Sequence, residues 1–300
     1  MIDRREFIQT VGSAALLTAV PVTAQANGRK ALPRRNIPNS DETLAVVGLG
    51  NAKVFYDGDM VTSRELIRVF LEHGGSYVDT GWGARDTVGR IMRENNAHDQ
   101  LFLGTYVEGE DLPSMRAEIG RLLDVQGGDS LDLVQVMAVE DFDRRRDQFA
   151  ALKEEGLTRF VGVARYNKEF YPPMMKLMGD GALDFIQINY SIMEPEAAAE
   201  ILPLAQETNT AVIINRPFIN GEYFGLVRGQ DLPEWAAEFD CDSWAQFSLK
   251  YILAHPTVNC VLTETSNPDH AIDNLGAGYG RLPDDDHRKR METVIRALMQ

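Results

Sequence analysis

The sequence predicts one closed (β/α)8 barrel, an α/β fold, and three observations lead to this prediction. Short apolar runs alternate with segments of helical period along most of the chain. The length of 300 residues suits a single barrel of this kind. No shift in composition marks a second domain after the N-terminal region. A doubly wound parallel sheet is the alternative that such alternation leaves open.

Eight of the apolar runs are predicted as strands, because they are rich in β-branched or aromatic residues and are bounded by turn residues. They are residues 44–49, 77–79, 101–107, 131–139, 159–164, 185–190, 211–215 and 258–262. Helices are expected over residues 63–73, 111–123, 141–154, 195–207 and 284–300. The longest interruption, residues 218–240, contains glycine and aromatic residues and is predicted as a loop over the end of the seventh strand.

Composition excludes several classes of protein. Hydrophobic residues make up 44% and charged residues 25% of the chain, and no apolar run approaches the roughly 20 residues of a membrane-spanning helix. The formal net charge of −15 argues against a nucleic-acid groove or an anionic lipid surface. Cys241 and Cys260 allow at most one disulfide and no cysteine-based zinc site. The histidines lack paired ligand spacing, so no metal site is predicted, and an all-carboxylate magnesium or calcium site at the acidic strand ends is the alternative left open.

The first 26 residues differ in character from the rest. Arg4 and Arg5 precede a weakly apolar stretch over residues 11–22, which ends in Ala-Gln-Ala at 24–26. This pattern resembles a twin-arginine export signal with a small-residue cleavage site, and an amphipathic first helix is the alternative. We therefore predict a signal peptide over residues 1–26, passage through the twin-arginine export machinery, and a periplasmic location.

Behind this signal, the proline-punctuated residues 27–42 are predicted as a polar N-terminal arm, and residues 43–300 as the barrel. Barrel enzymes place their chemistry where strands end. Asp79 ends a short apolar strand, so its carboxyl should be partly desolvated and its pKa raised. Tyrosines, arginines and further carboxylates follow the other strands.

The segment Tyr-Val-Asp-Thr-Gly-Trp-Gly at 77–83 resembles the aldo-keto reductase family. Residues 131–135, 156–163, 185–191 and 265–274 resemble further segments of that family, so the resemblance extends over about residues 44–274. It implies the barrel and carbonyl reduction by NADPH, with an aspartate, a tyrosine, a lysine and a histidine acting together. The tyrosine donates the proton, and the lysine, paired with the aspartate, lowers the pKa of that tyrosine.

Only one of these four residues is present at its matching position. The aspartate matches Asp79, whereas the tyrosine falls on Ala84, the lysine on Tyr106 and the histidine on Met137. Alanine and methionine cannot transfer protons, so the reductase would lack its acid at the intended place.

The cofactor segment is also altered. Glu264 stands where the family commonly has glycine or a lysine for the 2′-phosphate, and a carboxylate there would repel NADPH. NAD(P)H binding is therefore doubtful. If it is retained, the contacts are expected from Gln187, Asn189, Tyr190, Arg216, Ser266, Asn267 and Asn274.

We therefore expect a barrel that has lost carbonyl reduction and uses its mouth for non-redox acid–base chemistry on a small molecule, with Asp79 as proton donor. The further catalytic candidates are Tyr106, Glu140, Asp141, Arg85 and Asp86. The expected substrate contacts are Trp82, Arg165, Tyr166, Tyr223 and Phe224. Two alternatives stay open: an NAD(P)H-dependent oxidoreductase with a rearranged acid, and a non-catalytic binding protein.

Overall fold

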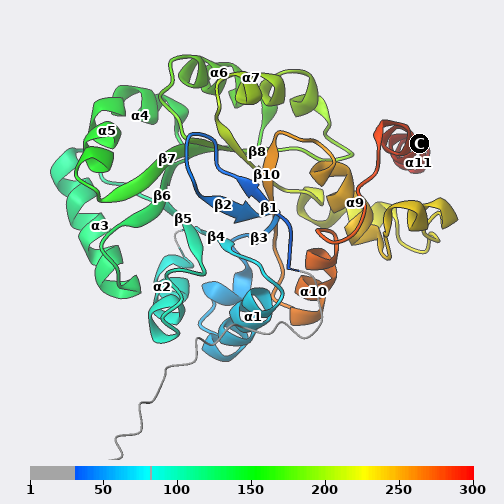
Figure 1. The fold of residues 1–300 in the computed structure, drawn as a ribbon, viewed down its shortest axis with the longest axis horizontal. Coiled ribbons are helices and arrows are strands. Elements are labelled where there is room, and N and C mark those ends of the chain that lie inside the picture. Colours follow the sequence, from blue (N-terminus) through cyan, green and yellow to red (C-terminus); the bar gives the residue numbers. More distant parts are fainter. Residues whose placement is uncertain (1–30, 82) are drawn as a thin grey trace, which may run out of the picture.

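The computed structural model describes residues 31–81 and 83–300, and its centre is a closed barrel of parallel strands (Figure 1). Going round the barrel, the strand order is β10-β3-β4-β5-β6-β7-β8-β9. The strands are β3 (Val47–Leu49), β4 (Tyr77–Thr80), β5 (Phe102–Tyr106), β6 (Leu131–Val136), β7 (Thr158–Ala164), β8 (Phe185–Asn189), β9 (Ala211–Asn215) and β10 (Val258–Thr263). The predicted (β/α)8 barrel is confirmed, and closure of the sheet by β10 and β3 excludes the doubly wound alternative.

Helices surround the barrel and bury their apolar faces against it. They are α1 (Met60–Glu72), α2 (Arg85–Glu94), α3 (Leu112–Gln126), α4 (Val139–Arg144), α5 (Arg146–Glu154), α6 (Tyr171–Gly179), α7 (Ile201–Glu207), α8 (Glu222–Leu226), α9 (Trp244–Leu253), α10 (Pro268–Gly276) and α11 (Asp285–Leu298). Several begin at a side chain that accepts a hydrogen bond from the first turn, such as Asp111 at α3 and Ser243 at α9.

The segment after β9 is not the plain loop that the sequence predicted. It contains α8 and two short 3-10 helices, η4 (Ile219–Gly221) and η5 (Glu234–Phe239). Further 3-10 helices occur elsewhere, as η1 (Lys53–Phe55), η2 (Lys168–Phe170) and η3 (Glu196–Ala199).

A two-stranded hairpin covers the N-terminal end of the barrel (Figure 1). It pairs β1 (Arg34–Asn36) with β2 (Thr43–Ala45) in antiparallel register. Part of the segment predicted as a polar arm is therefore a strand, and the predicted first strand is divided into β2 and β3. Ile37 and Leu44 of the hairpin pack on an inner cluster that includes Phe102, so this end is closed by apolar side chains.

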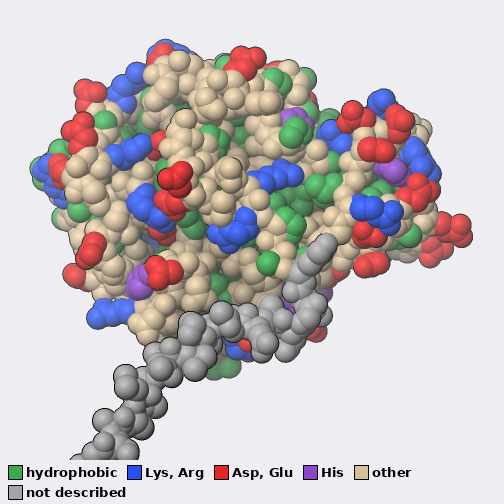
Figure 2. Space-filling view, viewed as in Figure 1, with side chains coloured by type: hydrophobic (Ala, Val, Ile, Leu, Met, Phe, Trp, Pro, Cys, Tyr) green, Lys and Arg blue, Asp and Glu red, His purple; other side chains and the backbone are tan. Residues whose placement is uncertain are grey.

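Acidic and basic side chains alternate over the face that carries the hairpin (Figure 2). Cys241 and Cys260 are both buried and free. Within residues 31–81 and 83–300, no helix is long and apolar enough to cross a membrane, and no three His, Cys, Asp or Glu side chains are placed to hold a metal ion. The predicted export signal lies outside the described residues.

Candidate active site

A cavity of about 880 Å³ opens at the C-terminal ends of the strands, opposite the hairpin. Its lining comes from the ends of most barrel strands and from the segment after β9. This is the end of the barrel where strand ends and loops can bring polar side chains together. The cavity is therefore the candidate active site.

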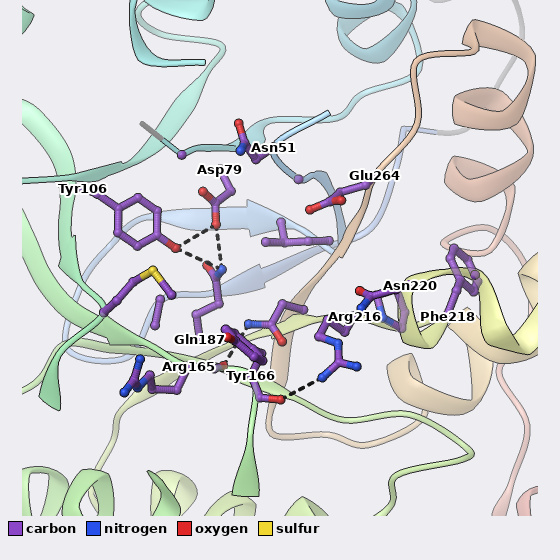
Figure 3. Close-up of a pocket in the computed structure, with 18 of the residues that line it drawn as sticks. Asn51, Asp79, Tyr106, Arg165, Tyr166, Gln187, Arg216, Phe218, Asn220 and Glu264 are labelled. Atoms are coloured by element: carbon purple, nitrogen blue, oxygen red, sulfur yellow. Dashed lines mark hydrogen bonds between the residues drawn. The ribbon is translucent and has the colours of Figure 1, made fainter. Parts of the chain in front are cut away.

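Asp79, Tyr106 and Gln187 form a hydrogen-bonded cluster on the floor of this cavity (Figure 3). The Asp79 Oδ2 atom accepts a hydrogen bond from Gln187 Nε2 at 2.6 Å and one from the Tyr106 hydroxyl at 3.3 Å. Asp79 lies in β4, Tyr106 in β5 and Gln187 in β8. Asp79 is only 5% exposed.

Burial controls the charge of this cluster. Burial is the largest effect and raises the pKa of Asp79 to about 6. The hydrogen bonds from Gln187 and Tyr106 lower this pKa, and the negative charge of Glu264 raises it. No cation among the described residues forms an ion pair with Asp79, so only these two hydrogen bonds oppose the desolvation. The Asp79 carboxyl can therefore hold a proton close to neutral pH.

Tyr106 occupies the place where the family has its lysine. Burial raises the pKa of its hydroxyl well above the usual value, and the charge of Asp79 acts in the same direction. The hydroxyl therefore stays protonated and serves as a donor to Asp79. At the other two altered positions, Ala84 is buried at the start of α2 and Met137 lines the cavity, so both places are apolar.

Glu264 is the second carboxylate of the cavity. It directly follows β10, and its side chain lies over Gly50, where an added Cβ would come within 2.6 Å of Glu264 Cγ. The side chain is accessible to solvent in the cavity, yet the surrounding walls partly desolvate it and raise its pKa. From the sequence, Glu264 was expected only to repel NADPH. Its place directly after the eighth strand, opposite a glycine at position 50 after the first strand, is the signal that could have indicated a carboxylate in the cavity.

The carboxylates that the sequence analysis favoured for this second role lie elsewhere. Glu140 is exposed on α4, and Asp141 forms an ion pair with Arg144 on the same helix at 2.5 Å. The predicted strand 131–139 ends at Val136, and α4 begins three residues later. Both acids therefore stand in the first turn of a helix, where negative charge suits the helix dipole, and neither lines the cavity.

Arg85 and Asp86 also point away from the cavity. Arg85 Nη1 donates to Glu118 Oε1 at 2.6 Å and to the Tyr106 carbonyl at 2.7 Å, so it supports the end of β5 from outside. Asp86 is exposed and pairs with Arg121 on α3. Both lie on α2, whose first turn faces its neighbour α3. Trp82 lies outside the described residues.

Three of the residues expected to contact the substrate line the cavity, and one does not. Arg165, Tyr166 and Phe224 line the cavity. Tyr223 does not, because it is buried and its hydroxyl donates to the carbonyl of Trp244. Tyr223 and Phe224 are adjacent in α8, so their side chains point in different directions.

Of the expected cofactor contacts, Gln187 and Arg216 line the cavity. Asn189 is turned away, since its Nδ2 donates to Glu194 and its Oδ1 accepts from Tyr171. Tyr190 is fully buried, and its hydroxyl accepts a hydrogen bond from Arg288. Neither can therefore contact a ring placed in the cavity.

The expected adenosine contacts also have protein partners. Ser266 Oγ accepts from the Val54 backbone, and Asn267 Oδ1 accepts from the Asp269 backbone as the cap of α10. Asn274 is buried within α10. Ser266 and Asn267 thus each use one side-chain oxygen to hold the local backbone.

The cavity wall presents buried polar atoms without a hydrogen-bond partner. Buried polar atoms in native proteins are nearly always paired, so a ligand or solvent in the cavity is one way in which those beside it would be satisfied. The unpaired atoms that belong to cavity-lining residues are Asn51 Oδ1, Arg165 Nε, Gln187 Oε1, Asn215 Oδ1 and Arg216 Nε.

Comparison with known proteins agrees with the fold. Residues 47–294 match the model of the aldo/keto reductase family, and no curated protein sequence matches the chain. The structure resembles an aldo-keto reductase from Bacillus halodurans in its holo form, at 20% identity over 88% of this chain and 96% of that chain, with a TM-score of 0.72. It also resembles an aldo-keto reductase from Klebsiella pneumoniae in complex with NADPH, at 17% identity over 88% and 95%, with a TM-score of 0.73. The predicted resemblance is confirmed, and the chain belongs to the aldo/keto reductase family.

Proposed function

We propose that this barrel catalyses a non-redox proton-transfer reaction on a small molecule, of the isomerisation, elimination, cyclisation or hydrolysis type. The observation that carries the proposal is the buried Asp79 carboxyl on the cavity floor, which has no cationic partner among the described residues and a second carboxylate, Glu264, in the same cavity. Burial raises the pKa of both carboxyl groups, and we assign the more deeply buried Asp79 as the acid and the solvent-accessible Glu264 as the base. We further propose that the protein works in the periplasm, as the sequence of its first 26 residues indicates.

In this mechanism Asp79 starts protonated and Glu264 starts ionised. Glu264 takes a proton from a substrate atom as Asp79 gives its proton to another, and the bonding electrons shift within the substrate between these two positions. For an isomerisation the net change is a proton shift; in an elimination the proton from Asp79 leaves with the departing group, and in a hydrolysis Glu264 takes the proton from a water molecule that is consumed. None of these reactions consumes an oxidant or reductant. Tyr106 and Gln187 donate hydrogen bonds to Asp79 Oδ2 and stabilise the carboxylate that forms there. Both carboxylates then return to their starting states by exchange with solvent.

The residues present do not fit a nicotinamide dinucleotide well. Asn189 and Tyr190 are engaged elsewhere, Ala84 and Met137 replace proton-transferring groups, and Glu264 adds negative charge to the cavity. The second candidate function, NAD(P)H-dependent carbonyl reduction with a rearranged acid, is favoured by family membership and by the unpaired Gln187 Oε1 in the wall. A solved relative of the same fold holds NADPH.

Two measurements on the purified mature protein separate these functions. We expect NADPH and NADH to leave the protein fluorescence and the calorimetric baseline unchanged. We expect the protein in deuterated water to catalyse deuterium incorporation into members of a panel of small carbonyl compounds, both neutral and anionic, followed by proton NMR. Binding of either nucleotide near micromolar affinity, with no deuterium exchange above the buffer rate, would overturn the proposal.

The pH dependence of this exchange is a second prediction. The rate requires protonated Asp79, so it should fall as the pH rises through about 6, and it requires ionised Glu264, so it should fall again at lower pH. Tyr106→Phe removes a hydrogen bond that lowers the pKa of Asp79, so the alkaline limb should move to higher pH.

The control for this profile is Tyr56→Phe, a change at an exposed tyrosine that does not line the cavity. Its limbs should coincide with those of the unmodified protein. An alkaline limb that stays in place in Tyr106→Phe would assign that limb to a group other than Asp79.

A further inference from the structure

Side chains of opposite charge line the two sides of the cavity. Asp79 and Glu264 lie on one side, and Arg165 and Arg216 lie on the other (Figure 3). The arginines come directly after β7 and β9, so the intervening strand β8 separates them. A ligand that fills the cavity meets two carboxyl groups at one end and two guanidinium groups at the other.

Neither arginine is neutralised by the protein. Over residues 31–81 and 83–300, no carboxylate lies within 4.0 Å of either guanidinium, although acids exceed bases by 15 in the sequence. The guanidinium of Arg165 lies 3.5 Å from the centre of the Phe170 ring, and Arg216 Nη1 donates only to the carbonyl of Tyr166 at 3.2 Å. The Nε atoms of both side chains are buried and unpaired. Each guanidinium group therefore carries its positive charge without a carboxylate partner, and its Nε–H donor has no acceptor.

Backbone contacts hold the strand ends that carry the two arginines. Asn215 Nδ2 donates to the Arg165 carbonyl at 2.9 Å, and the Arg165 amide donates to the Gln187 carbonyl at 2.7 Å. Arg216 adopts a left-handed conformation with φ of 50°, which a residue other than glycine keeps only where its surroundings enforce it. Strain of this kind is concentrated at functional sites. The backbone at both arginines is therefore constrained by its surroundings.

We propose that Arg165 and Arg216 bind the carboxylate group of the substrate, whose reactive part then extends to Asp79 and Glu264. This inference rests on the proposed function for the carboxylate side of the cavity, and it names the substrate class as a small organic carboxylate. Guanidinium groups recognise carboxylates through paired, charge-assisted hydrogen bonds. A dianionic phosphate is disfavoured, because its extra charge would face two carboxyl groups across the cavity.

The test is direct binding, measured without turnover. Benzoate and benzamide have nearly the same shape and differ in charge, so isothermal titration calorimetry with each isolates the contribution of the carboxylate. We expect benzoate to bind and benzamide to bind at least tenfold more weakly. Arg165→Met and Arg216→Met should each weaken benzoate binding about tenfold or more, and Arg165→Lys should restore part of it.

Arg228→Met is the matched control, because Arg228 is exposed and does not line the cavity, and it should bind benzoate as the unmodified protein does. Circular dichroism melts identify a variant that fails to fold, and Arg165→Lys then supplies the comparison. Equal binding of benzoate and benzamide would overturn the inference. So would tight binding of adenosine diphosphate that both methionine variants weaken, because the arginines would then serve a nucleotide. The binding test does not depend on turnover. If benzoate binding depends on both arginines but no deuterium exchange is observed, the carboxylate-binding site is supported and the proposed reaction is contradicted.

Discussion

Asp79→Asn is expected to reduce proton exchange by about 10²–10⁴-fold, the range associated with losing a positioned general acid. The amide has nearly the same shape as the carboxyl, and its oxygen can still accept from Gln187 Nε2, so the cavity floor should keep its form. The amide cannot deliver a proton. The deuterium-incorporation assay measures the loss, with Glu140→Gln on the outer face of α4 as a control expected to retain full activity.

The same variant should be more stable than the unmodified protein near neutral pH. The Asp79 carboxyl has a pKa of about 6 in the folded protein and 3.8 as its ordinary value, so folding disfavours its ionised form. Below the ordinary value the carboxyl is protonated in both states and carries no penalty. As the pH rises through about 6 the folded protein loses up to about 3 kcal/mol, which Asp79→Asn avoids. Urea denaturation at about pH 7 and about pH 4 should therefore show a gain at the higher pH alone. A variant that is destabilised at both would identify Asp79 as a structural residue.

Glu264→Gln is expected to cause a loss of similar size, about 10²–10⁴-fold, because glutamine cannot accept the substrate proton. Two features of the pH profile should change with it. The acidic limb, assigned to Glu264, should disappear from the residual activity. The alkaline limb should move to lower pH, since the negative charge of Glu264 raises the pKa of Asp79.

The effect of Glu264→Gln on the profile separates a catalytic role from a structural one. A change in packing alone would lower the rate at every pH by the same factor. Full activity in Glu264→Gln, measured over the whole profile, would leave Asp79 as the single carboxylate of the reaction and would contradict the proposed division of roles.

Much of the barrel could be predicted because buried strands carry a strong local signal. Each of the eight barrel strands overlaps an apolar run of the sequence. Strand ends were less certain, since Met137 and Ala138 continue the apolar run although pairing with β7 stops at Val136. β1 was missed because Arg34 and Arg35 make it polar and it is held by pairing with β2 rather than by burial.

The site was predicted only in part, because side-chain direction depends on the tertiary structure. Asp79, Tyr106, Arg165 and Tyr166 follow inward-facing ends of strands and line the cavity as proximity to a strand suggested. Arg85 follows its strand by five residues and is already in the first turn of α2, where it pairs with Glu118 on α3. The sequence does not give this pairing, since Glu118 is distant along the chain.

The hairpin under the barrel has a consequence for the order of folding. Arg35 of β1 donates to the carbonyls of Leu253, His255 and Val258, so the first strand is secured by residues near the end of the chain. β3 likewise gains its second neighbour only from β10. Such long-range pairings form slowly and demand that the whole loop between them be closed. The two carboxylates that we assign as acid and base therefore meet only when the last strand has docked, and a chain interrupted before β10 has neither a closed barrel nor a complete pair.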